Sequence, residues 1–357
     1  MAKLKTLPKA LIVASVIGGL GFAAYKFMPA QKQKVDEAPT AVAVPATPVP
    51  VAEDTPRNEP VFSAPSAVAS ITQARIPGAG IASGQKTGTN WPMTEDIVKS
   101  CSTPEYPLRN IISNGTLDNI NLVYSNPNSQ FGIAQEDALV LQQKLDKTMM
   151  SRIVAVFPFF SVEIHAITSS ASRITSLADM AGKRVIEGPA GSGTAVTVQL
   201  IKELTGIQWQ TVEGNLSQSD GLKAVQNGTA DVEFIVAGQP IRLLAGATGI
   251  KLVPIQHKAL EKFGYYTSAQ LPTGTYPWLS SSINTYKVNN VLVTYAYKNQ
   301  YQTEIGNLVT CITRNVSRLQ TEGHPKWRDV DPLDIDRVKW PVHPSALAAI
   351  KREAKHK

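Results

Sequence analysis

The sequence predicts an α/β protein with two lobes and a mostly parallel sheet. Short apolar runs alternate with helix-forming segments between residues 81 and 145, and the alternation begins again at Arg184. Strands that alternate with helices at this spacing are typical of parallel sheets. Glycine-rich loops follow the strands, and ligands of such sheets bind at the carboxyl ends of the strands. Two successive units joined by extended segments therefore indicate two lobes with a binding site between them.

The first unit contains three short apolar runs, which we expect to be strands at 81–83, 108–112 and 130–134. A helix is expected after each strand, ending near Ser100, Tyr124 and Leu145 respectively. Two paired strands, at 153–157 and 163–168, then lead toward the second unit. Each strand end is followed by polar or glycine-rich residues, which places candidate ligand contacts at one edge of the sheet.

The second unit begins with a strand at 184–187, followed by strands at 208–213, 231–236 and 252–254. Between the first strand and a helix starting near Thr194, Gly191 and Gly193 permit positive φ and close approach of the backbone. The free N–H groups of this helix, beside the Ser192 and Thr194 hydroxyls, favour binding of an anion. The loop lacks a P-loop lysine and dinucleotide spacing, which favours a carboxylate over a polyphosphate. A strand–helix turn without a ligand is the alternative interpretation.

The N-terminus carries a compartment signal. Lys3, Lys5 and Lys9 precede an uncharged apolar run over residues 10–25, a length between a signal-peptide core and a short membrane span. The positive flank places the N-terminus in the cytoplasm and the rest of the chain outside it. We expect residues 1–28 to be a membrane anchor, with secretion to the periplasm after signal cleavage as the alternative. The Pro- and Ala-rich residues 29–75 are expected to be a disordered linker.

The net charge of +7 does not indicate nucleic-acid binding, because the basic residues are scattered and form no stripe with aromatic residues. The chain has two cysteines, Cys101 and Cys311. In an oxidising compartment they could form one disulfide, although two separate buried thiols remain an equal alternative.

The sequence contains no recognisable catalytic or metal-binding motif. Glu163 and His165 would share one face of a strand, which allows an acid–base pair or half a metal site but favours a structural or hinge role. The five histidines show no HExxH spacing, and Ser192 lacks the Gly-x-Ser-x-Gly context of a hydrolase nucleophile. We therefore expect no enzyme activity, no metal and no cofactor.

Seven phrases, taken in order, resemble the TRAP-associated extracytoplasmic immunogenic (TAXI) family of periplasmic solute-binding proteins. The most characteristic is Gly188-Pro-Ala-Gly-Ser-Gly-Thr194, preceded by Gly182-Lys-Arg-Val185. The other phrases lie at 83–91, 113–119, 131–137, 163–165, 238–240 and 343–346. The resemblance covers roughly residues 81–350, which is nearly all of the predicted folded region.

The resemblance implies a two-lobed, type II periplasmic-binding-protein fold that closes on a small ligand. It implies lobe I at 76–168 and 275–357 and lobe II at 169–274. Its members work with ion-driven TRAP permease subunits and bind small carboxylates such as glutamate or 2-oxoglutarate. The chain departs from the family in its apparent tether and in Asn90-Trp91, where paired tyrosines are more common. A membrane-tethered envelope sensor or scaffold that reuses this fold is the alternative function.

The expected ligand contacts come from both lobes. We expect the backbone N–H groups at Ser192 to Thr194 to bind the carboxylate, with contacts from the other lobe. Trp91 could instead be a core residue, and Asn119 could instead cap a helix. The full set of expected ligand-binding residues is Thr87, Thr89, Trp91, Asn119, Gln135, Gly191, Ser192, Gly193 and Thr194.

Overall fold

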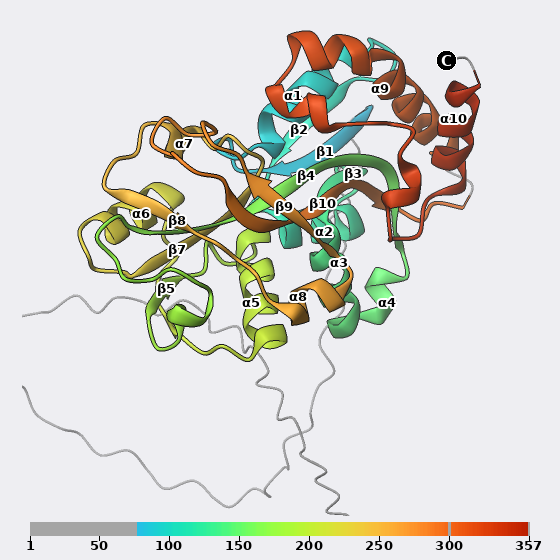
Figure 1. The fold of residues 1–357 in the computed structure, drawn as a ribbon. Helices are drawn as coiled ribbons and strands as arrows, with labels where there is room; N and C mark the ends of the chain where they lie inside the picture. Colours follow the sequence, from blue (N-terminus) through green and yellow to red (C-terminus); the bar gives the residue numbers. More distant parts are fainter. Residues whose placement is uncertain (1–76, 299–300, 356–357) are drawn as a thin grey trace, which may run out of the picture. The chain divides into compact units, whose positions relative to one another are not determined.

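The computed structural model describes residues 77–298 and 301–355, which form helices around a ten-stranded sheet (Figure 1). The α/β part of the predicted fold is confirmed. The predicted anchor and linker, residues 1–28 and 29–75, lie outside the described residues. Within the described part, no helix is long and apolar enough to cross a membrane.

The first three strands form one parallel edge of the sheet. They are β1 (Ala79–Gly84), β2 (Leu108–Ile112) and β3 (Phe131–Gln135), with β1 between the other two. Helices α1 (Asn90–Cys101), α2 (Thr116–Ser125) and α3 (Glu136–Leu145) follow these strands in turn. The predicted strand–helix alternation of this unit is therefore present. A short helix, α4 (Lys147–Met150), then leads to the longest strand.

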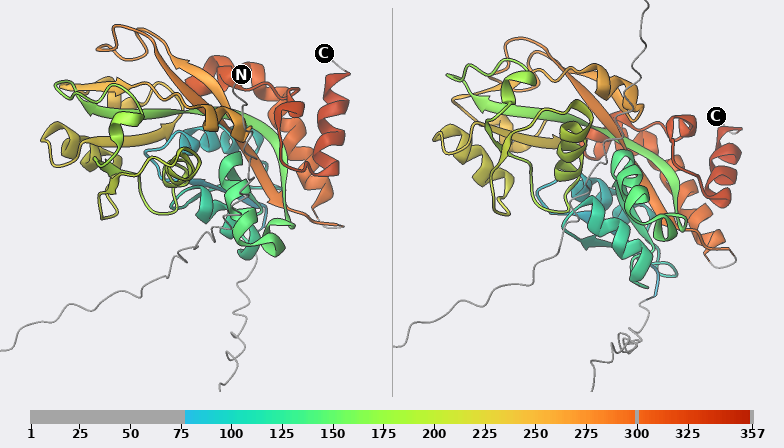
Figure 2. Two further views of the ribbon diagram at one scale, coloured as in Figure 1. Left: turned by 60° about the horizontal axis from the view of Figure 1, so that its bottom comes forward. Right: turned by 90° about the horizontal axis from the view of Figure 1, so that it is seen from below.

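Two long antiparallel strands run through the fold. They are β4 (Ile153–Ser169) and β10 (Ile283–Tyr295), which pair with each other along much of their length (Figure 2). The prediction of two separate strands at 153–157 and 163–168 is wrong. Pro158 lies inside β4, opposite Val291 and next to an irregularity in the register, which accommodates its missing N–H.

Three of the remaining strands continue the main path of the sheet on the other side of β4. In the described part, four strand pairs are parallel and five are antiparallel, so the prediction of a mostly parallel sheet is wrong. The main path of the sheet has the order β2-β1-β3-β10-β4-β7-β5-β6. Beyond β4 this path contains β7 (Val232–Ala237), β5 (Arg184–Ile186) and β6 (Gln210–Thr211). Off the path, β8 (Ile250–Val253) pairs with β4 and β9 (Tyr266–Leu271) pairs with β10.

The helix that follows β5 has well-defined ends. α5 (Gly193–Thr205) begins after Ser192, whose Oγ accepts a hydrogen bond from the Ala195 N–H, and ends at Gly206 in the left-handed conformation. Its Val196, Val198, Leu200 and Ile201 are buried, so the helix is held by its apolar face. The other helices of this region are α6 (Gln218–Gln226), α7 (Arg242–Ala245) and α8 (Lys258–Phe263).

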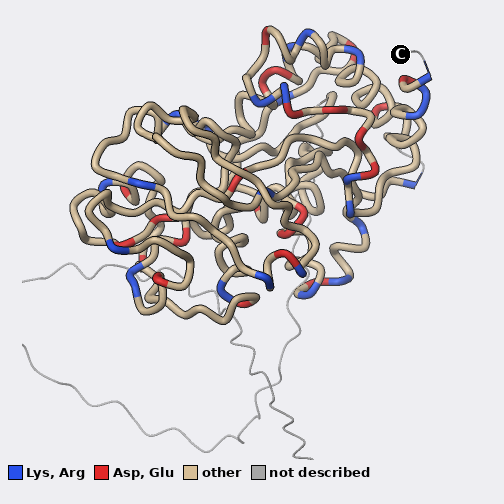
Figure 3. The backbone as a smooth tube through the Cα atoms, viewed as in Figure 1, with Lys and Arg blue, Asp and Glu red and all other residues tan. Residues whose placement is uncertain are grey.

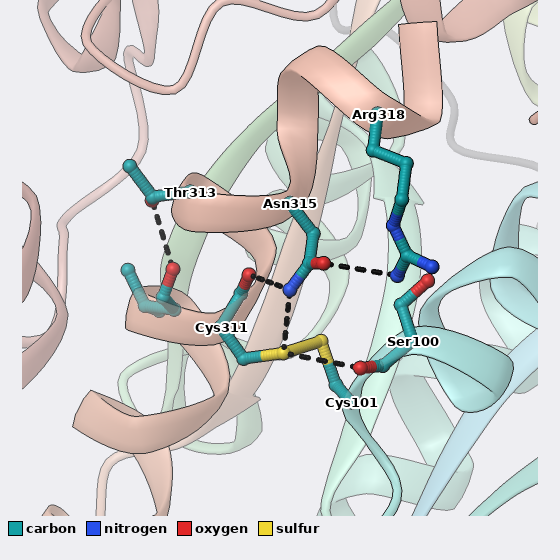
Figure 4. The surroundings of a disulfide bond; sticks show 7 residues. Ser100, Cys101, Cys311, Thr313, Asn315 and Arg318 are labelled. Carbon is teal, nitrogen blue, oxygen red and sulfur yellow. Dashed lines mark hydrogen bonds between the residues drawn. A yellow bond between two sulfur atoms is a disulfide. The ribbon is translucent and has the colours of Figure 1, made fainter. Parts of the chain in front are cut away.

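A disulfide joins two helices that are far apart in the sequence. Cys101, at the end of α1, is bonded to Cys311 in α9 (Gln302–Glu322), with an S–S distance of 2.10 Å (Figure 4). The last helix, α10 (Pro344–Ala354), packs against α9. Between them lie two short 3-10 helices that connect α9 to α10, Pro325–Asp329 and Ile335–Arg337.

Candidate functional site

Two of the predicted ligand loops touch each other through their backbones. The Leu117 N–H, in the first turn of α2, donates to the Gly191 carbonyl across 3.2 Å. A Cβ placed on Gly115 would lie 2.9 Å from the Ser192 Cα. The loop that follows β2 and the glycine-rich loop that follows β5 are therefore in direct contact, as two loops facing each other across a closed site would be.

Gly193 and Gln135 form the closest of these contacts. Both residues are buried, and a Cβ on Gly193 would lie 1.3 Å from the Gln135 Oε1. The same carboxamide accepts a hydrogen bond from the Thr116 Oγ1 at 3.4 Å and donates one to the Thr197 Oγ1 at 3.2 Å. The absence of a side chain at Gly193 is thus what allows Gln135 to reach α5.

The hydrogen bonds continue from Gln135 to a buried carboxylate, Asp137. The Thr197 Oγ1 donates to the Asp137 Oδ2 at 2.6 Å, and the Tyr266 hydroxyl donates to the same oxygen at 3.0 Å. Burial raises the pKa of Asp137 from 3.8 to about 6, although the two hydroxyls and the Ala138 N–H oppose the shift. The chain Thr116–Gln135–Thr197–Asp137–Tyr266 therefore connects α2, α3, α5 and β9.

The predicted anion-binding hydroxyls have partners within the fold. The Ser192 Oγ caps α5, and the Thr194 Oγ1 accepts a hydrogen bond from the Val236 N–H at 3.0 Å. The N–H groups of Gly193 and Thr194 lie in the first turn, where a helix leaves its donors without intrahelical partners. These backbone groups are the donors that remain for an anion at the N-terminus of α5.

The other predicted residues lie around the first strand and α2. Thr87 is exposed, whereas Thr89 and Trp91 are partly buried at the start of α1. The Lys86 ammonium lies 5.4 Å from the centre of the Trp91 ring. Asn119 is buried inside α2 and does not cap it; its Nδ2 donates to the Ile133 carbonyl at 2.7 Å. Of the predicted set, the structure brings Gln135, Gly191, Ser192 and Gly193 closest together.

Glu163 lies in the middle of β4 and forms a buried ion pair. Its Oε1 lies 2.9 Å from the Lys326 Nζ, and the two side chains are 4% and 2% exposed. The Gln239 N–H donates to the other oxygen of Glu163 at 2.9 Å. This carboxylate connects β4 to the end of β7 and to the Pro325–Asp329 helix, which agrees with the structural role favoured from the sequence.

His165 is two residues further along β4 and is fully buried. Its Nε2 lies 2.8 Å from the Tyr276 hydroxyl, and its Nδ1 lies 3.0 Å from the Glu163 carbonyl. Burial lowers the pKa of His165 to about 4, so the ring is neutral at pH 7. Both ring nitrogens are occupied.

No group of three His, Cys, Asp or Glu side chains suited to a metal occurs among the described residues.

A cavity of about 420 Å³ lies elsewhere, between α8 and the β9–β10 ribbon. Seven of its eight lining residues have a polar side chain, and one of these, Glu261, is charged. None of its residues was predicted to bind a ligand, because no strand was predicted beyond residue 254. The lining residues are Gln256, Glu261, Ser268, Ala269, Gln270, Asn284, Thr285 and Tyr286.

Basic and acidic residues are interspersed over the described fold (Figure 3). In this view Lys and Arg form no continuous stripe along any helix or strand. Several of the cations are neutralised locally, as Arg184 is by Asp231 at 2.8 Å and Arg314 is by Glu353 at 2.8 Å.

Comparison with known proteins gives a family match over most of the chain. The model of the NMT1-like family matches residues 81–351. Solved structures are similar at low identity. The periplasmic sulfonate-binding protein SsuA from Methylobacillus flagellatus is 12% identical, with a TM-score of 0.48 over 79% of this chain and 96% of that one. An arginine transport system periplasmic binding protein from Legionella pneumophila is 12% identical, with a TM-score of 0.42 over 70% of this chain and 100% of that one.

Proposed function

The chain belongs to the NMT1-like family, whose members are substrate-binding and transport proteins rather than enzymes, and we propose that it is an extracytoplasmic solute-binding subunit. In this proposal it captures a small carboxylate or amino acid, such as glutamate or 2-oxoglutarate, for a tripartite TRAP-type permease. The observation that carries the proposal is the glycine-rich start of α5, whose first-turn N–H groups lie next to Gln135 and the α2 loop.

We infer a two-lobed, type II binding-protein architecture for this task. Residues 76–168 and 275–357 form lobe I, residues 169–274 form lobe II, and β4 and β10 pass between them. A ligand that contacts both lobes only in the closed state binds that state more tightly than the open state. This difference in affinity shifts the equilibrium toward closure. The direct contacts between the α2 loop and the α5 loop support this proposal.

We propose that the protein is periplasmic and held at the inner membrane by residues 1–28, with residues 29–75 as a tether. Fractionation of cells and protease digestion of spheroplasts test this placement. The expected result is full-length protein in the inner-membrane fraction, with its folded part open to external protease. A mature form starting near Ala24 in the soluble periplasmic extract would instead establish signal cleavage.

Native mass spectrometry of the purified full chain, followed by calorimetry with glutamate and 2-oxoglutarate, tests the ligand. Gly193→Val should abolish the binding heat, because the added carbons would displace the Gln135 carboxamide, a proposed ligand contact, from the start of α5. Gly306→Ala is the matched control, since a Cβ there meets no atom closer than 3.9 Å. Circular dichroism must show that both variants are folded. If Gly193→Val binds the acid as strongly as the wild type does, the carboxylate does not bind at the start of α5.

One observation favours the second candidate, a tethered sensor or scaffold. The carboxamide of Gln135 already lies against Gly193, accepts a hydrogen bond from Thr116 and donates one to Thr197. A binding site that is closed by its own side chains needs no solute. If native mass spectrometry finds no small molecule and calorimetry finds no heat with any small acid, the scaffold becomes the better explanation.

A further inference from the structure

Asp137 occupies a position where the two proposed lobes meet. It lies at the start of α3, in lobe I, and is fully buried. Both hydroxyls that donate to its Oδ2, those of Thr197 in α5 and Tyr266 in β9, belong to lobe II. An apolar cluster surrounds these bonds on the side of α3 and α5: Ala138, Leu141, Val196 and Leu200.

No cation neutralises Asp137 among the described residues. Burial is the largest influence on its pKa, followed by hydrogen bonds from Thr197, Tyr266 and the Ala138 N–H. Lys144, Lys258 and Lys262 on the neighbouring helices are exposed. The other charged groups of these elements interact with other partners. Glu136 accepts hydrogen bonds from the Lys339 and Trp340 N–H groups, and Glu261 accepts one from the Tyr286 hydroxyl. Lys202 binds Glu187, Gln199 donates to Glu203, and the Lys339 ammonium contacts the Tyr265 ring and the Gly264 carbonyl.

Separation of α3 from α5 would expose this carboxylate to water and remove both hydroxyl donors. We propose that Asp137 links closure of the two lobes to uptake of a proton, so that the closed state becomes more favourable as the medium becomes more acidic. The proposal rests on the two-lobed receptor proposed above and adds a regulation of its site. Protons would thereby promote solute capture without contacting the solute.

The direction of this pH effect follows from the two environments of the Asp137 carboxylate. In the closed structure burial raises the pKa of Asp137 to about 6, whereas an exposed aspartate in the open state keeps the ordinary value of 3.8. The closed state therefore binds the proton more tightly, and acid favours closure. With these two values, the ratio of closed to open molecules should rise roughly fourfold between pH 7.5 and pH 5.5.

Fluorescence energy transfer in the full-length chain tests the link without any solute. Asn121→Cys in α2 and Lys223→Cys in α6 place one dye on each proposed lobe, and the two native cysteines are already joined. The transfer efficiency should rise as the pH falls from 7.5 to 5.5. Asp137→Asn, which does not titrate, should show no such rise. Asp336→Asn, at an exposed aspartate, should behave like the parent.

A second variant keeps the test decisive if Asp137→Asn fails to fold. Thr197→Val removes the hydroxyl that stabilises the ionised form, so the midpoint of the pH response should move to higher pH. The proposal is overturned if the parent shows no rise in transfer efficiency with falling pH, or if Asp137→Asn shows the same rise. It is also overturned if Thr197→Val leaves the midpoint of the rise unchanged. A pH response that Asp137→Asn abolishes, in a chain that binds no small acid, supports the link while rejecting the transport function.

Discussion

Single residues between α3 and α5 determine how closely these helices approach. Gln135 and Thr197 lie 62 positions apart in the sequence, and their side chains meet only because Gly193 adds no carbon between them. Sequence reasoning identified Gln135 and Gly193 as members of one site from the loops in which they lie. It could not show that one would fill the space beside the other, because that contact depends on the packing of two helices.

The first prediction concerns this contact. Gly193→Ala should destabilise the fold by about 1–3 kcal/mol, because the new Cβ overlaps the buried Gln135 carboxamide. Shortening the partner in Gly193→Ala/Gln135→Ala should recover part of the loss, giving a favourable coupling in a double-mutant cycle. Urea unfolding measures all four proteins. Additive effects of the two substitutions would mean that the side chains do not collide.

The second prediction concerns Glu233, a buried carboxyl in β7. It is 1% exposed, its Oε2 has no hydrogen-bond partner, and its Oε1 lies against Gly221 of α6. Burial raises its pKa from 4.5 to about 8. The folded state therefore holds the proton more tightly than the unfolded chain, and stability falls as the pH rises from 4.5 through about 8.

Glu233→Gln removes this titration and should stabilise the protein at pH 7 by on the order of 2–3 kcal/mol. The gain should shrink toward pH 5, where the unfolded chain also begins to bind the proton. Chemical unfolding at pH 5 and pH 7 measures the difference, with the exposed Glu105→Gln as the control. An equal gain at the two pH values would show that Glu233 is not the titrating group.

At the scale of elements, the sequence predicted local structure better than strand direction. The helix expected at 136–145 is α3, with the same ends, because a strand of apolar residues gives way there to charged helix formers. Two strands were predicted at 153–157 and 163–168, yet β4 continues through Pro158, next to an irregular register opposite Val291. Strands β9 and β10 lie beyond the last predicted strand. Each antiparallel pair among the described strands involves β4 or β10, and these pairs make the sheet mixed. Pairing over more than 100 residues leaves no local pattern.

The third prediction concerns the disulfide between α1 and α9. The bonded cysteines are 210 residues apart. In the chain-entropy model, closing so long a loop restricts the unfolded chain enough to add about 4–5 kcal/mol of stability. Cys101→Ala/Cys311→Ala should lose a similar amount in urea unfolding, and reductant should then have no further effect. Titration of two free thiols in the denatured, unreduced protein would show that the bond is absent in solution.

At the scale of the whole molecule, the described core is built from residues between Ala79 and Ile350. The chain divides into residues 1–69 and 70–357 by its internal contacts. From composition alone, the sequence predicts a boundary near residue 75. Composition can mark where a core begins, whereas the route of β4 and β10 through that core emerges only from the fold.

The last prediction follows from this division. A fragment of residues 71–357 should be soluble, folded and as stable as the full chain, because the segment removed supplies none of the described core residues. Circular dichroism and the melting temperature of the fragment, compared with those of full-length protein in detergent, provide the measurement. The disulfide and all five described apolar clusters lie within the fragment. A melting temperature several degrees below that of the full chain would mean that residues before 71 pack on the fold and contribute to its stability.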